Sequence, residues 1–119
     1  MEEEEEATQD EQFEIRRTAG RLLRFRGERL AHVSEHSHQG STQNRWYEFC
    51  LYRTTGGRYV LEQDYFTQWQ GESNSITARV LDTIPDVIAA LAFESGEVTG
   101  ALELELLEKA GIEYSEEVE

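Results

Sequence analysis

The sequence of 119 residues contains one cysteine, one proline and one methionine, and it has no apolar run long enough to cross a bilayer. With Cys50 alone, no internal disulfide can form, and within Phe49-Cys50-Leu51 this thiol is typical of a small buried hydrophobic residue. The N-terminus, Met1 followed by five glutamates, lacks the basic start and apolar middle of a secretory signal. We therefore expect a soluble cytoplasmic protein with no membrane partner.

Motifs that would carry catalysis are also missing from the sequence. It contains no nucleophile elbow, phosphate-binding glycine loop, zinc-protease helix or cysteine cluster. The acids Glu48, Glu62, Asp64 and Glu72 could pair as general acid and base, although any acidic, strand-rich protein offers such pairs. We therefore predict that the protein is not an enzyme and find no evident small-molecule substrate.

Three histidines form a candidate metal site. His32, His36 and His38 would point to one face of an extended strand, where imidazoles could bind zinc or nickel. A closed structural site needs a fourth ligand, Glu35 would face the other way, and solvated histidines are ordinary in a polar loop. The sequence therefore predicts no metal and no cofactor.

The net charge of −14 is distributed unevenly along the chain. Residues 1–14 carry eight acids and no base, residues 15–60 carry nine arginines and three acids, and residues 61–119 carry fourteen acids and two bases. The stretch 1–12 is too polar to offset the entropy of ordering, so we predict a disordered acidic tail before one domain over residues 13–119. The preference for arginine over lysine fits a GC-rich genome or high salt, where screening reduces repulsion between acids.

Alternating apolar and polar residues predict strands through the first two thirds of the chain. The predicted strands are Phe13–Thr18, Leu22–Arg26, Arg29–His36, Arg45–Arg53, Arg58–Trp69 and Ser75–Leu81. Both faces of Arg45–Arg53 are largely apolar, which is typical of a central strand. Thr54-Thr55-Gly56-Gly57 predicts a tight reversal after it, and Gly27-Glu28 predicts a turn between the second and third strands.

Two helices are predicted after the last strand. Thr83 begins a pattern that resembles a capping box, so the first helix is expected to run from Ile84 to Leu91 or Ala92. Ser95 would cap a second helix that begins near Gly96 and ends at Gly111. The fold class predicted is α+β, an antiparallel meander of five or six strands covered on one face by the two C-terminal helices.

Two alternatives concern the C-terminal third. The alternation of Leu102, Leu104 and Leu106 also fits a strand, although the length of the segment and Gly111 favour a helix. The stretch Ile112–Tyr114 would add a last short edge strand.

The stretches Leu51–Val60, Thr67–Glu72 and Leu107–Tyr114 carry strand and turn residues in a characteristic arrangement. Together they resemble the small prokaryotic family called EXLDI, over residues 20–115. The Glu-x-Leu-Asp-Ile motif that names this family is absent from the end of the chain. The resemblance implies an α+β fold and assigns no activity or catalytic residue.

Arginines and aromatic residues gather in the first half of the chain and suggest an interaction surface, because protein interfaces are enriched in Trp, Tyr and Arg. An uncovered sheet face of this composition would favour a protein partner or a homodimer. The residues predicted to form it are Arg24, Arg26, Arg29, Trp46, Tyr52, Arg53, Arg58 and Trp69. We therefore predict a non-catalytic binding or regulatory protein that acts through protein–protein contacts of an Arg/aromatic sheet face.

Two other functions remain open. The same sheet could bind single-stranded nucleic acid through arginines and stacked aromatic rings, although the net negative charge opposes this approach. Alternatively, the protein could be an acidic nucleic-acid mimic that blocks a DNA-handling protein. The carboxylates that would imitate phosphates are Glu97, Glu103, Glu105, Glu108, Glu113 and the tail glutamates. Pairing of the arginines with Glu62, Asp64 and Glu72 would explain the charges without any partner.

Overall fold

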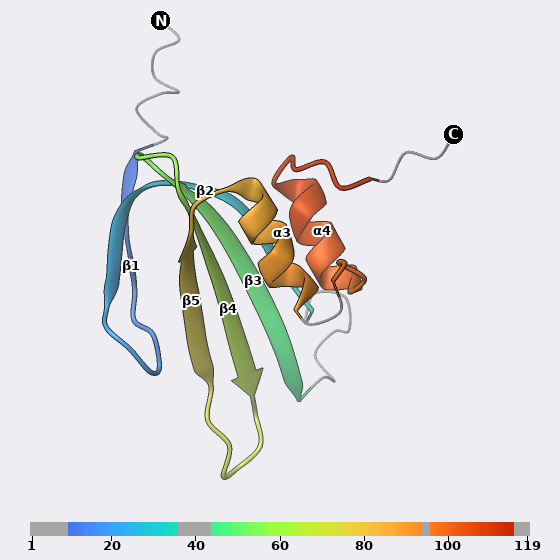
Figure 1. Ribbon diagram of the computed structural model, residues 1–119. Helices are drawn as coiled ribbons and strands as arrows, with labels where there is room; N and C mark the ends of the chain where they lie inside the picture. Colours follow the sequence, from blue (N-terminus) through green and yellow to red (C-terminus); the bar gives the residue numbers. More distant parts are fainter. Residues whose placement is uncertain (1–9, 36–43, 94–95, 116–119) are drawn as a thin grey trace, which may run out of the picture.

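The computed structural model describes residues 10–35, 44–93 and 96–115. Its strands form one antiparallel sheet in the order β1-β2-β3-β4-β5. The elements are β1 (Glu11–Ile15), β2 (Leu23–Ser34), β3 (Arg45–Thr54), β4 (Tyr59–Thr67), β5 (Ser75–Leu81), α3 (Ile84–Ala92) and α4 (Ala101–Lys109). Both helices lie against one side of the sheet (Figure 1), so the predicted α+β meander is confirmed, with five strands.

The β3–β4 hairpin is the centre of the sheet, and its two strands pair along almost their whole length. Both faces of β3 are buried at its middle, with Phe49 and Leu51 on one side and Cys50 and Tyr52 on the other. Gly57 in the connecting turn has a φ of 90°, which only glycine adopts readily. The predicted central strand and the glycine turn after it are therefore confirmed.

The second strand differs from its prediction. Gly27-Glu28 is not a turn, because β2 continues through it as one strand of 12 residues. The glycine serves a close approach instead: a Cβ atom on Gly27 would overlap the carbonyl oxygen of Arg53 on β3. A register shift between Arg29 and Ala31 marks a bulge, and bulges bend the strand that contains them.

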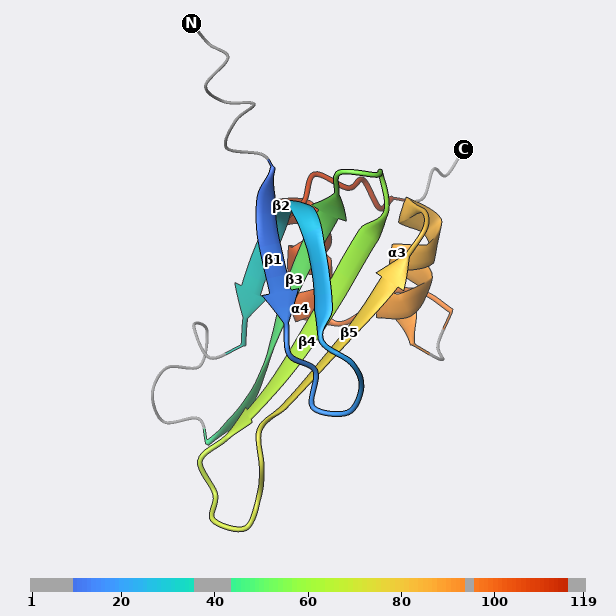
Figure 2. The same cartoon turned by 90° about the vertical axis from the view of Figure 1, so that its left-hand side faces the viewer.

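The sheet is curled, so that the β1–β2 hairpin lies over the side opposite to the helices (Figure 2). The loop between β1 and β2 closes this curl against the outer edge of β5. The backbone N–H of Thr18 donates to the carbonyl of Ile76 at 2.9 Å, and the N–H of Ile76 donates to Thr18 Oγ1 at 2.7 Å. Because these bonds occupy an edge that would otherwise be unpaired, they protect the last strand. We call the enclosed side the curl side and the other the helix side.

The first helix begins as the sequence predicts. The Oγ1 atom of Thr83 accepts a hydrogen bond from the backbone N–H of Asp86 at 3.2 Å, which caps α3. The second helix begins at Ala101, so its predicted start near Gly96 is wrong; Ser95 lies outside the described residues. Val98 donates its backbone N–H to the hydroxyl of Tyr114 at 2.9 Å, and this contact holds the preceding stretch out of the helix.

The end of α4 follows the sequence more closely. Gly111 has a φ of 76°, and the N–H groups of Gly111 and Ile112 donate to the carbonyls of Glu108 and Leu107. This pair of bonds is the Schellman motif, which confirms the predicted helix end at a glycine. The predicted edge strand over Ile112–Tyr114 is wrong, because Ile112 instead packs into the core beside α4.

Each side of the sheet has its own buried cluster. The helix-side core joins sheet residues to helix residues, chiefly Val33, Phe49, Leu51, Val87, Leu91, Leu106 and Leu107. The curl-side core consists of Ile15, Cys50, Tyr52, Val60 and Ala78, with Phe13 and Phe25 packed against it. Cys50 is a free thiol buried there, as predicted.

Two sequence predictions concern the chain outside these cores. Residues 1–9 of the predicted acidic tail lie outside the described residues, and Glu11 and Gln12 belong to β1. Of the described residues, none forms a helix that is both long enough and apolar enough to span a bilayer.

Candidate functional site

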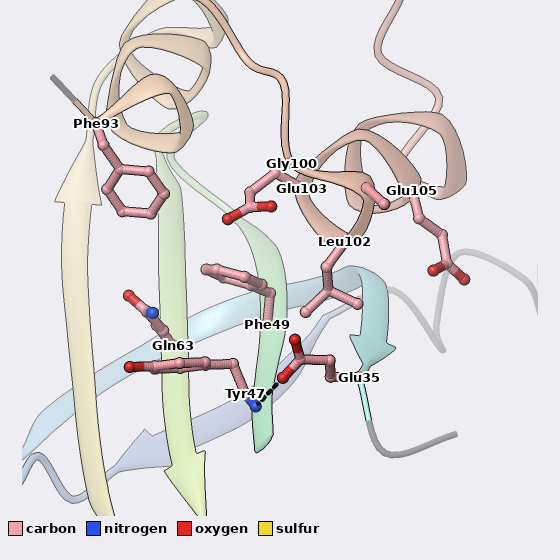
Figure 3. Close-up of a pocket in the computed structure, with 10 residues that line it drawn as sticks. Glu35, Tyr47, Phe49, Gln63, Phe93, Gly100, Leu102, Glu103 and Glu105 are labelled. Carbon is pink, nitrogen blue, oxygen red and sulfur yellow. Dashed lines mark hydrogen bonds between the residues drawn. The ribbon is translucent and has the colours of Figure 1, made fainter. Parts of the chain in front are cut away.

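A cavity lies between the helix side of the sheet and α4 (Figure 3). Its volume is about 730 Å³, and small-ligand sites usually have volumes of about 300–1,000 Å³. The strands β3 and β4 form its floor, the first turns of α4 form one wall, and Phe93 forms another. The cavity is therefore assembled from segments that are distant in sequence.

The floor consists of side chains that strand alternation brings to the helix side. Tyr47 and Phe49 lie two residues apart on β3, and Gln63 on β4 is the register partner of Phe49. Phe49 is buried, whereas Tyr47 is 42% exposed. No hydrogen bond of the Gln63 side-chain amide is found among the described residues, so this amide is available to a ligand.

Phe93 forms a wall of the cavity and has an unusual backbone. It follows α3 with a φ of 55° and a ψ of −124°, a region that suits glycine and is strained for a bulky residue. Its side chain is 58% exposed, and it also borders two other hollows of about 650 and 350 Å³. Strain of this kind costs stability and concentrates at functional sites. The strain at Phe93 therefore marks this residue as a candidate part of a site.

Three carboxylates border the cavity, Glu35, Glu103 and Glu105. The Oε1 atom of Glu35 accepts a hydrogen bond from the backbone N–H of Tyr47 at 3.1 Å, which fixes its position. Glu103 lies in the first turn of α4, where the helix dipole favours an acid, and its carboxylate points into the cavity (Figure 3). Glu105 forms an ion pair with Lys109 at 3.3 Å. No cationic side chain lines the cavity in the described part of the chain, so its border is negative.

A second group of carboxylates lies on the curl side, around Glu48. Its Oε1 atom is 2.9 Å from His32 Nε2, and its Oε2 atom accepts hydrogen bonds from Ser34 Oγ at 3.1 Å and Trp46 Nε1 at 3.0 Å. Burial alone would raise the pKa of Glu48, but the hydrogen bonds from His32, Trp46 and Ser34 outweigh burial and hold the pKa below its usual value. Glu48 is thus kept ionised by its neighbours.

Asp64 is the register partner of Glu48 across the hairpin, and its environment is the opposite one. Burial, a hydrogen bond with Glu62 and the charges of Glu62 and Glu48 raise the pKa of Asp64 to about 8. Its Oδ1 atom is buried without a hydrogen-bond partner among the described residues. Two neighbouring carboxyls with opposed pKa shifts are the arrangement that acid–base chemistry uses.

Tyr52 and Cys50 complete this network. The hydroxyl of Tyr52 donates to Glu62 Oε1 at 2.9 Å, and Glu62 is only 9% exposed. Burial first, and then the charge of Glu62, raise the pKa of Cys50 to about 11; burial also raises the pKa of Tyr52. Both groups are therefore neutral at physiological pH and unsuited to act as nucleophiles.

The predicted acid and base candidates separate into two places. Glu48, Glu62 and Asp64 come together on the curl side, but Glu72 lies in the loop after β4. Arg45 Nη2 is 2.6 Å from Glu72 Oε2, and hydrogen bonds from Arg45 and Thr67 lower the pKa of Glu72 to about 2. Glu72 therefore belongs to a surface ion pair.

The predicted histidine site is only partly described. His32 contacts Glu48, while His36 and His38 lie outside the described residues. Among the residues with described positions, no three His, Cys, Asp or Glu side chains are arranged to hold a metal ion.

The arginines predicted to form an interaction surface are engaged within the chain. Arg24 and Arg26 alternate with Phe25, which packs on the curl-side core, so both arginines point away from it. Most of the predicted arginines pair with acids of the same chain, and the pairs are Arg24–Glu14 at 3.0 Å, Arg26–Asp10 at 3.3 Å, Arg53–Glu28 at 2.8 Å and Arg58–Asp82 at 2.9 Å. These contacts neutralise positive charge that a partner would need.

The remaining predicted surface residues lie elsewhere. Arg29 is the register partner of Tyr52, which is buried on the curl side. Trp46 stacks on Phe66 with ring centroids 5.4 Å apart, also on the curl side. Trp69 is 51% exposed in the loop after β4, with the guanidinium of Arg45 5.5 Å from its ring centroid. The eight predicted residues thus occupy both faces and a loop rather than one surface.

The cavity residues were not singled out by sequence reasoning. Tyr47, Phe49 and Phe93 are ordinary apolar residues in pattern, and the sequence presents Glu103 and Glu105 as carboxylates of a possible nucleic-acid mimic, not as cavity residues. The one available signal was Phe93, a large apolar residue just after the last residue of a predicted helix. Nothing in a sequence distinguishes a ring that fills a core from a ring that borders a void.

Comparison with protein-family models, with curated proteins and with solved structures finds no match to this chain. The resemblance to the EXLDI family therefore stays a prediction.

Proposed function

We propose that this chain is a non-catalytic binding protein whose ligand occupies the cavity between the β3–β4 floor and α4. The observation that carries the proposal is a void of about 730 Å³ bordered by accessible aromatic rings, those of Tyr47 and Phe93. Ligand sites are concave, largely apolar and equipped with a few polar groups that orient the ligand. Gln63 and Glu103 provide such groups here.

The position of the curl-side carboxyls supports a binding role rather than a catalytic one. Glu48, Glu62 and Asp64 project from the opposite side of the sheet from Tyr47, Phe49 and Gln63, because residues alternate along β3 and β4. A ligand in the cavity is separated from these acids by the sheet itself. General acid or base catalysis requires hydrogen-bonding distance to the reacting group.

The protein-contact surface predicted from the sequence is not the basis of this proposal. Its arginines are distributed over both faces and several are paired with acids, for example Arg24 with Glu14 and Arg58 with Asp82. The same pairing reduces the positive charge available to a nucleic acid, and no contact among the residues with described positions favours phosphate mimicry in particular. We therefore propose a binding function, as the sequence predicts, but with the cavity as its site in place of the Arg/aromatic surface.

Titration with the neutral fluorescent probe N-phenyl-1-naphthylamine tests the proposal, since its emission rises in an apolar site. Leu102 projects from α4 into the cavity (Figure 3), so Leu102→Trp fills part of the void. We expect this variant to bind the probe at least about tenfold more weakly than the unaltered protein, a loss of roughly 1.4 kcal/mol.

The matched control is Leu104→Trp, on the same helix. Leu104 is exposed and does not line the cavity, so this variant should bind the probe as the unaltered protein does. Circular dichroism would establish that both variants are folded. Equal probe affinity in the two tryptophan variants, or no probe binding by the unaltered protein, would show that the cavity is not a binding site.

A further inference from the structure

We infer that the ligand of the cavity is a small organic cation, a substituted ammonium ion with an aromatic or bulky aliphatic group; this inference rests on the binding function proposed above. Three features of the site point to this class. They are the negative border, the exposed aromatic rings and the volume.

Charge distinguishes a cation from a neutral apolar ligand. Glu35, Glu103 and Glu105 border the void, and its described lining contains no lysine, arginine or histidine. Glu105 is partly compensated by Lys109, and Glu35 by the N–H of Tyr47. No ion pair of Glu103 is found within the described residues, and its carboxylate lies beside Gly100 at the start of α4, on the border of the cavity, where it can meet a ligand cation.

The charge of the whole chain reinforces this local preference. The sequence carries a net charge of −14, and α4 belongs to its strongly acidic last part. A field of this sign raises the local concentration of cations and repels anionic ligands. Anionic metabolites are therefore poor candidates for the cavity.

Aromatic rings favour a substituted ammonium over a simple metal cation. The rings of Tyr47 and Phe93 are 42% and 58% exposed, and both border the void. The negative face of an aromatic ring attracts an ammonium group, and the alkyl substituents of that group gain from apolar contact with the rings. A hydrated metal ion would make no favourable apolar contact with the floor around Phe49.

The volume favours a small molecule over a protein partner. A void of about 730 Å³ accommodates a compact ligand whole. Partly enclosed by α4, Phe93 and the sheet, it does not present the broad open face that a folded partner would need.

Three compounds of matched shape separate charge from apolar contact. Benzyltrimethylammonium is the cation, neopentylbenzene is its uncharged isostere, and phenylmethanesulfonate is an anion of similar size. Each is measured by its displacement of N-phenyl-1-naphthylamine from the full chain at low ionic strength. We expect the cation to bind about five- to tenfold more tightly than the neutral isostere, as a cation–π contact and an unpaired carboxylate imply. The anion should bind more weakly than either.

A charge-removing substitution tests the role of Glu103. Glu103→Gln keeps the shape of the side chain and its place in the first turn of α4, and we expect the preference for the cation over the isostere to fall about fivefold or more. The affinity for neopentylbenzene should be unchanged. Glu108→Gln, an exposed position of α4 outside the cavity, should leave both affinities unchanged.

The outcomes distinguish this inference from the proposed function. If the neutral isostere binds as tightly as the cation, or if Glu103→Gln leaves the preference intact, the organic-cation inference is overturned and the cavity remains a binding site. If no compound and no probe binds, both proposals fail. The peptide Lys-Phe-Lys, acetylated and amidated at its ends, tests a protein partner. If this peptide binds and benzyltrimethylammonium does not, the cavity binds a segment of a protein, and the inference is overturned.

Discussion

On the helix side of the sheet, aliphatic residues pack against two helices, and a void remains where Tyr47, Phe93 and Glu103 meet. On the curl side, the rings of Phe13, Phe25 and Tyr52 lie with centroids 4.9–5.4 Å apart, and polar groups gather beside them. Both sides are built on the same three central strands. The difference comes from what covers each side, the helices α3 and α4 in one case and the bent β1–β2 hairpin in the other.

Acidic groups have different roles on the two sides of the sheet. The curl-side carboxyls bond mainly to neighbouring side chains, Glu62 to Tyr52 and Glu48 to His32, so their energies enter stability and its pH dependence. The carboxylate of Glu103 lies beside Gly100 at the border of the cavity, so its energy enters ligand affinity. Stability and binding should therefore respond to different substitutions.

The largest expected effect is on core packing. Leu106→Ala removes a fully buried side chain of α4, and Ile15→Ala removes a buried side chain of the curl-side core. Each should lower the free energy of unfolding by about 2–5 kcal/mol, as large-to-small core substitutions do. Urea denaturation measures both.

The two substitutions should differ in their effect on the cavity. Leu106→Ala loosens the helix that forms one wall, so probe binding should fall with stability, whereas Ile15→Ala should leave the probe affinity of the folded protein intact. Loss of probe affinity in the folded Ile15→Ala variant would mean that the two sides of the sheet are not independent.

A smaller effect is expected from Asp64→Asn on the curl side. Asp64 faces Glu62 on its own strand and Glu48 on β3, with His32 and Tyr52 bonded to those two acids. Its folded pKa of about 8 lies far above the ordinary value of 3.8, so between these values the folded protein retains a proton that the unfolded chain has lost. The contribution of Asp64 to stability is therefore fully present below about pH 4 and is lost as the pH rises to 8.

Asparagine cannot ionise and supplies a donor to Glu62, so this loss should disappear in the variant. At pH 8 the variant should be more stable than the unaltered protein by about 1–3 kcal/mol, the range for relief of a buried unsatisfied group, and the difference should shrink toward pH 5. Urea denaturation at pH 5, 6.5 and 8 measures it. Glu72→Gln is the control, since its low pKa places its titration below this window. A difference that does not depend on pH would contradict the assignment.

The sequence predicts the fold well where local signals and tertiary contacts agree. The β3–β4 hairpin follows from alternation and from glycines that allow a tight reversal, and α3 follows from the Thr83 cap. Counting back from the turn also places Glu48 opposite Asp64, so the pairing of these acids could be derived from the hairpin alone.

The failures occur where one residue has two physical meanings. A glycine such as Gly27 permits either a turn or a close approach between strands, and only the position of Arg53 on the neighbouring strand decides between them. In the same way, the start of α4 depends on the contact of Val98 with Tyr114, which are distant in sequence. Local propensity contains neither contact.

The cavity is less predictable from the sequence than any strand. A void forms where elements that are distant in sequence do not pack fully against one another. Tyr47, Phe93 and Leu102 each fit the apolar pattern of their element, and no spacing rule reports that they surround a space rather than a side chain. For the same reason, the sequence presents the acids of α4 only as carboxylates that could imitate phosphates. Only the packing of α4 against β2 and β3 gives Glu103 its orientation.

The smallest expected change in stability is at Phe93, and it tests whether this ring serves binding or packing. Phe93→Ala and Phe93→Gly both remove the ring, but only glycine relieves a φ of 55°. The Phe93→Gly variant should therefore be about 1 kcal/mol more stable than the Phe93→Ala variant. It should be about as stable as the unaltered protein, because the exposed ring of Phe93 buries little surface. Both variants should lose probe affinity alike. A glycine variant destabilised as strongly as Leu106→Ala, with probe binding retained, would mean that Phe93 is a core residue and that the strain at this position serves the fold.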